Sequence, residues 1–134
     1  MKIVIVDGQG GRMGAMLVKK LREEYSGDIY AVGTNSIATS AMIKAGASFG
    51  ATGENPVVKN ARDADIIAGP IGIVVADAIL GEVTASMAAA VGESAAQKVL
   101  IPVNNCSVTV AGVGDNSLAW LVAEASREIL RLIK

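Results

Sequence analysis

The stretch that decides the fold is Asp7-Gly8-Gln9-Gly10-Gly11-Arg12-Met13-Gly14, a glycine-rich loop that follows an apolar run over residues 2–6. That run is short and rich in β-branched residues, as expected of a strand buried on both faces of a sheet. After the loop, apolar residues recur at three- and four-residue steps from Met13 to Leu21, which predicts an amphipathic helix over residues 12–25. A buried strand, a glycine turn and a helix in this order are typical of the first unit of a Rossmann-type fold.

The rest of the chain continues this alternation. Further strands are expected at 28–33, 47–51, 65–68 and 97–103, and helices at 36–45, 55–64, 71–97 and from 116, with a break near Gly81 and a restart at Thr84. Alternating strands and helices predict a parallel sheet covered on both faces. We therefore expect a single domain over residues 1–134, a three-layer α/β doubly wound sheet with five parallel strands in the order 3-2-1-4-5.

A sixth strand is expected over Ser107–Val113. Only Asn104, Asn105 and Cys106 separate it from the fifth strand, which is too short a connection for a parallel crossover. The sequence therefore predicts a hairpin, with an antiparallel sixth strand at the edge of the sheet beside the fifth.

Composition excludes several classes of partner. The chain has 12 basic and 13 acidic residues and only 3% aromatics, which argues against a nucleic-acid surface. One cysteine excludes an intrachain disulfide and fits a reducing compartment. The apolar N-terminal run is too short for a signal peptide, and Asp77 interrupts an apolar segment over 71–80 that falls short of a bilayer span. We expect a cytoplasmic protein with no contact to nucleic acid or membrane.

The glycine loop lies where a Rossmann-type fold binds phosphates. Glycines there let the backbone turn and approach a pyrophosphate, while the helix N-terminus supplies free N–H groups and a positive dipole. Gly8 and Gly10 fit the first two glycines of the dinucleotide fingerprint, but Met13 takes the third place. The alternative is that the glycines only allow tight packing of the turn. We assign the following loop residues to a cofactor: Gly8, Gln9, Gly10, Gly11, Arg12, Met13 and Gly14.

Two other segments follow predicted strands and are expected at the same edge of the sheet. Thr34-Asn35-Ser36 comes after the second strand and holds no acid for a ribose hydroxyl, so its small polar groups are expected to accept a 2′-phosphate, which favours NADP over NAD. The alternative there is plain helix capping by Asn35 or Ser36. Gly69, Pro70 and Ile71 follow the fourth strand and are expected along the ligand crevice, with a simple turn as the alternative.

Groups that could carry catalysis are few. Asp77 is an acid in apolar surroundings, which points either to a structural partner or to a base with a raised pKa. Cys106 has no histidine anywhere in the chain to activate it. With no histidine and one cysteine, no metal site is expected.

Two resemblances add to this interpretation. The string Gly-Gly-Arg-Met-Gly at 10–14 resembles the cofactor loop of dihydrodipicolinate reductases, which bind NADH or NADPH, and implies that Arg12 and Met13 line a pyrophosphate. The catalytic histidines of those enzymes have no counterpart here. Over its full length the chain resembles an uncharacterised bacterial family of stand-alone domains of unknown function, through the strings VGTNSIATSAM (32–42), GATGEN (50–55), IIAGPIGIV (66–74) and IPVNNC (101–106).

The favoured hypothesis is a nucleotide-binding domain of the NAD(P) type that binds or senses its ligand without a self-contained catalytic site. The alternative is a small NAD(P)-dependent oxidoreductase whose substrate site a second subunit completes. The mean hydropathy of +0.46 and the nearly continuous apolar character of 71–90 also predict a homodimer that buries this segment.

Overall fold

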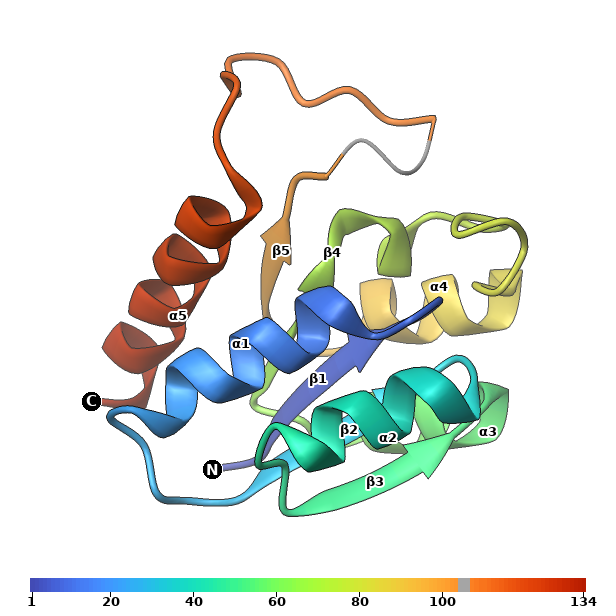
Figure 1. Cartoon of the computed structure of the whole chain (residues 1–134). Coiled ribbons are helices and arrows are strands. Elements are labelled where there is room, and N and C mark those ends of the chain that lie inside the picture. Colours follow the sequence, from blue (N-terminus) through green and yellow to red (C-terminus); the bar gives the residue numbers. More distant parts are fainter. Residues whose placement is uncertain (104–106) are drawn as a thin grey trace.

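Strand β1 (Ile3–Asp7) lies in the middle of the sheet, and all of its residues are buried. The computed structural model in Figure 1 describes residues 1–103 and 107–134. β1 pairs in parallel with β2 (Ile29–Gly33) and with β4 (Ile66–Pro70). The outer strands are β3 (Phe49–Thr52), beside β2, and β5 (Gln97–Ile101), beside β4. The order β3-β2-β1-β4-β5 confirms the predicted five-stranded parallel sheet.

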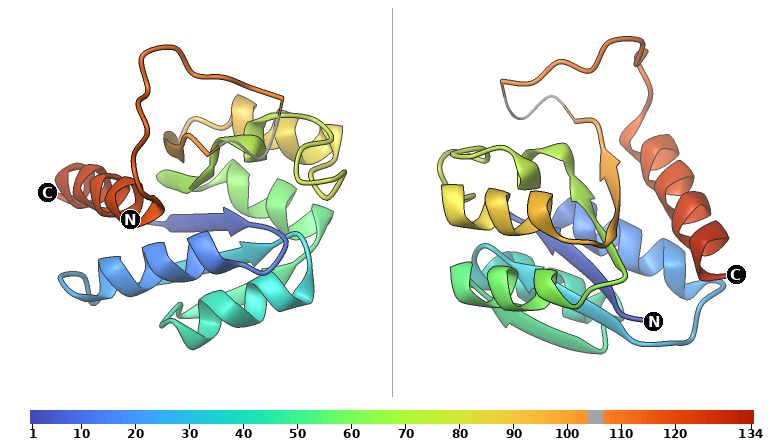
Figure 2. Two further views of the ribbon diagram at one scale, coloured as in Figure 1. Left: turned by 45° about the horizontal axis from the view of Figure 1, so that its top comes forward. Right: turned by 180° about the vertical axis from the view of Figure 1, so that it is seen from behind.

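Helices cover both faces of this sheet, as the two views in Figure 2 show. One face carries α1 (Arg12–Arg22), α2 (Ser36–Lys44) and α5 (Leu118–Ile133), which pack side by side. The other carries α3 (Glu54–Arg62) and α4 (Ala85–Glu93). The predicted three-layer arrangement is therefore present.

The two faces enclose two apolar cores that meet at β1. Ile3 and Ile5 point into the core under α1 and α5, while Val4 and Val6 point into the core under α3 and α4. Successive side chains of a strand lie on opposite faces of the sheet, so a strand covered on both sides must be apolar at every position. This is why β1 has no polar residue before Asp7.

The predicted sixth strand is not formed. Residues 107–113 pair with no strand in the described part of the chain, and most of them are exposed. The predicted turn at Asn104, Asn105 and Cys106 lies outside the described residues. Val108 and Val110 give the segment a strand-like alternation, but the chain turns at Gly112, which has a φ of 84°, before a strand of useful length can form. Alternation over so few residues does not stabilise a strand without a partner.

The apolar segment 71–97 is less helical than predicted. It opens with a short 3-10 helix (Ile71–Val74), continues through turns, and becomes α4 only after Thr84, whose side chain accepts a hydrogen bond from the Met87 amide. The predicted break and restart are thus correct, but the residues between them are turns. Three non-glycine residues there adopt left-handed backbone conformations: Asp77, Ile79 and Leu80.

This segment does not supply the exposed apolar surface on which the predicted homodimer rests. Ile73, Ala78, Val83 and Met87 are buried within the chain, against β4 and the other residues of their core. Leu80 is the exception, with an exposed fraction of 94%. The homodimer remains a prediction, but the apolar character of this segment no longer supports it. In the described residues no helix combines the length and apolar character needed to cross a membrane.

The turn from β1 into α1 has no room for a side chain at Gly11. This residue has a φ of 71°, and a Cβ built on it would lie 2.7 Å from both the Cα and the carbonyl oxygen of Ala38 in α2. Contact with backbone atoms cannot be relieved by rotating a side chain. Gly10, one residue earlier, has nothing within 4 Å of its added Cβ. The packing of the fold therefore requires a glycine at position 11 but not at position 10.

We predict that Gly11→Ala lowers the free energy of unfolding by about 1–3 kcal/mol, because it combines left-handed backbone strain with a clash against α2. Gly10→Ala is the matched control and should change it by no more than about 0.5 kcal/mol. Urea unfolding followed by circular dichroism measures both. Equal stability of the two variants would contradict the close packing of α1 on α2.

Candidate ligand site at the carboxyl ends of the strands

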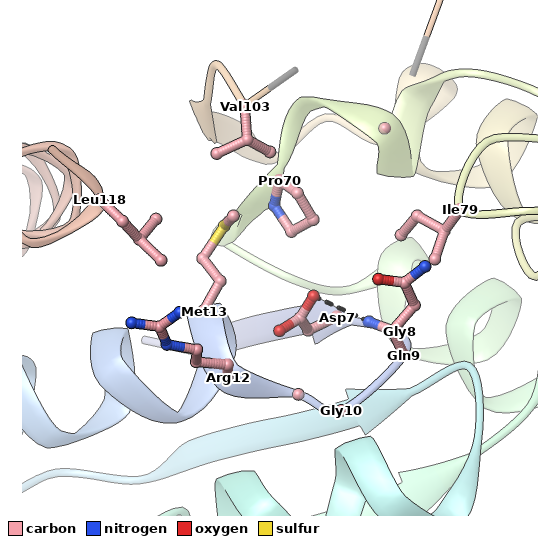
Figure 3. Close-up of a pocket in the computed structure, with 12 residues that line it drawn as sticks. Asp7, Gly8, Gln9, Gly10, Arg12, Met13, Pro70, Ile79, Val103 and Leu118 are labelled. Carbon is pink, nitrogen blue, oxygen red and sulfur yellow. Dashed lines mark hydrogen bonds between the residues drawn. The ribbon is translucent and has the colours of Figure 1, made fainter. Parts of the chain in front are cut away.

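A cavity of about 280 Å³ opens where β1 and β4 end. The connection from β1 leads toward β2 on one side and that from β4 toward β5 on the other, so the strand order reverses here. Such a switch point is where doubly wound sheets bind ligands. The glycine loop forms one side of the cavity, and Figure 3 shows apolar side chains around the remainder. These are Met13, Pro70, Ile79, Val103 and Leu118.

The structure brings together some of the predicted site residues and separates others. Residues 8–13 and Pro70 line this cavity. Gly14 and Gly69 do not line it, and Ile71 lines a neighbouring cavity of about 460 Å³ beneath residues 108–116. Thr34, Asn35 and Ser36 line neither cavity. The predicted site therefore divides into a β1–β4 part and a β2 part.

Asp7 is a cavity residue that our sequence analysis did not assign. Its exposed fraction is 5%. One carboxylate oxygen accepts the Gly8 amide at 2.8 Å and the other accepts the Gly14 amide at 2.7 Å. Desolvation by burial raises the pKa of Asp7; the two amide hydrogen bonds oppose this rise, and the charge of Glu82 adds to it. An acid directly after a buried strand and before a glycine loop was the available signal.

The loop also presents backbone amides that the protein leaves without acceptors. The Gly11 amide donates to the Gly8 carbonyl and the Gly14 amide to Asp7. Within the described ranges, the amides of Gly10, Arg12 and Met13 have no acceptor. The latter two belong to the first turn of α1, where backbone N–H groups lack helical partners and the helix dipole is positive. The Arg12 side chain is exposed and lies beside the cavity on the Leu118 side in Figure 3.

The β2 part of the predicted site is occupied by a carboxylate of the chain itself. Glu82, from the β4–α4 connection, accepts hydrogen bonds from the Thr34 hydroxyl at 2.6 Å and the Asn35 side-chain amide at 2.8 Å. Asn35 also caps α2 by accepting the Ala38 amide at 2.9 Å, as the capping alternative expects. The site assigned to a 2′-phosphate thus already holds a negative charge. No sequence pattern near Thr34 points to Glu82.

Two other candidates do not join the site. Asp77 is exposed rather than buried in apolar surroundings, and its amide donates to the Val83 carbonyl at 2.7 Å. It therefore lies in an exposed turn and does not line the cavity. Cys106 lies outside the described residues. Among the residues that the structure does describe, no group of three acidic, cysteine or histidine side chains is placed to hold a metal ion.

The raised pKa of Asp7 predicts a pH dependence of stability. The folded protein holds this proton more tightly than the unfolded chain, so Asp7 contributes stability below the ordinary carboxyl pKa of about 3.9 and loses it as the pH rises through the folded-state pKa. Asp7→Asn removes this titration. Urea unfolding between about pH 4 and pH 7 should show wild type losing stability relative to Asp7→Asn as the pH rises.

Asp63→Asn is the control for this experiment. Asp63 is exposed, and its hydrogen bond to Lys2 lowers the pKa of Asp63. Its contribution is therefore complete above the ordinary carboxyl pKa and falls as the pH drops through it, so the difference from wild type should be flat above about pH 5. Parallel stability curves for wild type and Asp7→Asn would contradict the role of burial at Asp7.

Among curated proteins, none matches this chain. The solved structure of a dodecameric FMN-dependent UbiX-like decarboxylase from Escherichia coli O157:H7 is similar over 98% of this chain and 76% of that chain, with a TM-score of 0.46 and 18% sequence identity.

The prediction of NADP or NAD as the cofactor is contradicted. The similar structure is that of an enzyme described as FMN-dependent, and FMN is a flavin. The geometry of this chain gives a physical reason for the correction. The 2′-phosphate of NADP was expected to bind the side chains of Thr34 and Asn35, and both already donate to the Glu82 carboxylate. A 2′-phosphate there would also meet a like charge.

The resemblance that the sequence carries over its full length is confirmed in its main part. The matching family covers residues 2–134 and has no assigned activity. The bacterial origin of this chain and the likeness of its glycine loop to a reductase loop remain predictions. The chain belongs to the family described as "Domain of unknown function (DUF3842)".

Proposed function

We propose that this domain binds a phosphorylated ligand of mononucleotide size and recognises or presents it without a catalytic site of its own. The observation that carries the proposal is the cavity at the ends of β1 and β4, called the β1–β4 cavity. Loop amides that have no acceptor among the described residues lie there, together with an apolar wall. A ligand with a phosphate at one end and an apolar ring at the other matches both parts. Small-molecule sites commonly combine an apolar lining with a few polar groups that fix the orientation.

The phosphate would bind at the start of α1. The amides of Arg12 and Met13 point out of the first helical turn, and the positive end of the helix dipole favours an anion there. The Arg12 guanidinium, which is always charged, adds a donor that suits phosphate oxygens. Gly10 leaves this approach open because it carries no side chain, and its added Cβ would contact nothing in the protein.

The apolar part of the ligand would lie against Met13, Pro70 and Leu118. A volume of about 280 Å³ lies at the lower end of the ~300–1,000 Å³ that is typical of ligand cavities. Such a space suits a nucleoside monophosphate or a ligand of similar size.

Binding without chemistry fits the titratable groups of the cavity. The acidic group in its described lining is Asp7, which already accepts two backbone amides, and the basic group is the guanidinium of Arg12. General acid–base catalysis needs a group within reach of the ligand whose pKa is matched to its task, and often a second group of opposite role. The oxidoreductase alternative gains no support from this arrangement.

Isothermal titration with a panel of AMP, GMP, ADP, GDP and FMN tests the proposal. At least one should bind wild type, and Gly10→Val should weaken that binding at least tenfold, because its side chain extends into the phosphate approach while the backbone stays relaxed. Gly92→Val is the matched control: its side chain also meets open space, but on α4, away from the cavity, and should leave affinity unchanged. The proposal fails if wild type binds none of the panel, or if Gly10→Val binds as wild type does.

Self-association is proposed as a separate property. The homodimer predicted from hydropathy is expected in sedimentation velocity as a species of twice the chain mass of 13.6 kDa at micromolar protein. A 13.6 kDa species at every concentration would exclude it. A cytoplasmic location likewise remains a prediction from composition.

A further inference from the structure

Three hydrogen-bond donors from two separate loops converge on one oxygen of Glu82. The Gln9 amide of the glycine loop donates to Oε1 at 2.9 Å, the Thr34 hydroxyl at 2.6 Å and the Asn35 side-chain amide at 2.8 Å. Partial burial disfavours the charge on Glu82, but these three hydrogen bonds outweigh that effect and lower its pKa. The carboxylate is therefore ionised at neutral pH and stands where a ligand anion would find the same donors.

The packing around Gly8 shows how tightly this carboxylate closes the β2 side. A Cβ at Gly8 would lie 2.7 Å from the Thr34 hydroxyl oxygen and 3.0 Å from Glu82 Oε1. Ile79 approaches the same point, at 3.3 Å, and its side chain forms the adjoining part of the cavity wall. Gly8, Thr34, Ile79 and Glu82 thus form a continuous partition between the β1–β4 cavity and the end of β2.

The segment that carries Glu82 adopts a costly backbone conformation. Ile79 and Leu80 have φ values of 57° and 53°, and a β-branched residue is seldom found in that region. Asp77 is left-handed as well, at 66°. Conformations of this kind persist only where the surroundings hold them. The hydrogen bonds that Glu82 accepts from the glycine loop and from the β2–α2 connection help to hold the segment in this conformation.

We propose that Glu82 is a specificity-determining residue, which closes the β2 side of the glycine loop and confines ligands to the β1–β4 cavity. The inference rests on the proposed function for the identity of the cavity as a ligand site. It deepens that function by excluding a class: ligands with a second phosphate or carboxylate directed over β2 are rejected, because Glu82 already uses the donors and repels the charge. Ligands with a single phosphate, bound at Arg12 and Met13, are accepted.

Inorganic phosphate, titrated into ¹⁵N-labelled protein and followed by NMR, tests this inference. In wild type, the Gln9 backbone amide and the Asn35 side-chain amide should show no saturable shift. In Glu82→Ala, both should shift saturably. The dissociation constant should be at least tenfold below the lower limit that the wild-type titration sets. Amide shifts at Arg12 and Met13 report the proposed phosphate site separately, in either protein.

Glu54→Ala is the matched control. Glu54 also ties the β4–α4 connection to a neighbouring element, the start of α3, by accepting the Thr84 hydroxyl at 2.6 Å. The donors Gln9, Thr34 and Asn35 bond to Glu82 instead. Removal of Glu54 takes away the same charge and loosens the same segment, yet should leave the β2 side closed. Phosphate shifts at Asn35 in Glu54→Ala would therefore overturn the specific role of Glu82.

Glu82→Gln keeps the inference testable if Glu82→Ala does not fold. The glutamine retains one acceptor oxygen without the charge, so phosphate shifts at Gln9 and Asn35 should fall between those of wild type and Glu82→Ala. A folded Glu82→Ala, or in its absence a folded Glu82→Gln, that responds as wild type does overturns the inference. If phosphate reaches Asn35 in Glu82→Ala while wild type binds no nucleotide, the closure stands and the proposed function fails.

Discussion

The close approach of α1 to α2 is the contact on which the ligand-facing edge of this protein depends. Gly11 has no space for a Cβ against the backbone of Ala38, and this fixes the angle at which the chain leaves β1 and enters α1. With α1 held there, its first-turn amides point toward the cavity, and Met13 forms part of the cavity wall. The glycine at position 11 thus serves packing first and ligand access only through it.

Two carboxylates frame the glycine loop and differ in how the protein treats their charge. Burial raises the pKa of Asp7, whereas three hydrogen bonds lower that of Glu82. An anion bound at the loop has to avoid both charges. At the start of α1, Asp7 already accepts the Gly14 amide, while Arg12 adds a positive charge and the helix dipole favours an anion.

The glycine pattern alone could not separate a phosphate loop from a packing motif. Gly8 and Gly11 lie against protein atoms that a side chain would hit, while Gly10 faces open space in the cavity. In the sequence, nothing distinguishes these three glycines, because all belong to one motif. Their surroundings differ only in the folded protein, where α2 and the β4–α4 connection supply atoms that exclude a side chain at Gly8 and Gly11.

What the sequence by itself determined is the order of elements and the position of the loop. Buried β-branched runs such as Ile3–Val6, and the helical period that follows, depend on local spacing, so the elements could be predicted. The strand order β3-β2-β1-β4-β5 was predicted from the Rossmann-type arrangement that the glycine loop indicates. The sixth strand could not, because alternation over a few residues gives no information on whether a partner strand is present. Strand pairing depends on the rest of the fold.

Only the tertiary structure decided which side chains meet at the candidate site. Glu82 and Thr34 are 48 residues apart, and the hydrogen bond between them exists because the loops after β1, β2 and β4 meet at one edge of the sheet. The burial of Ile73 and Met87 could not be predicted for the same reason. The sequence does not show whether an apolar residue packs in the core of its own chain or against a partner. Local periodicity determines which elements form, whereas long-range packing determines which side chains meet.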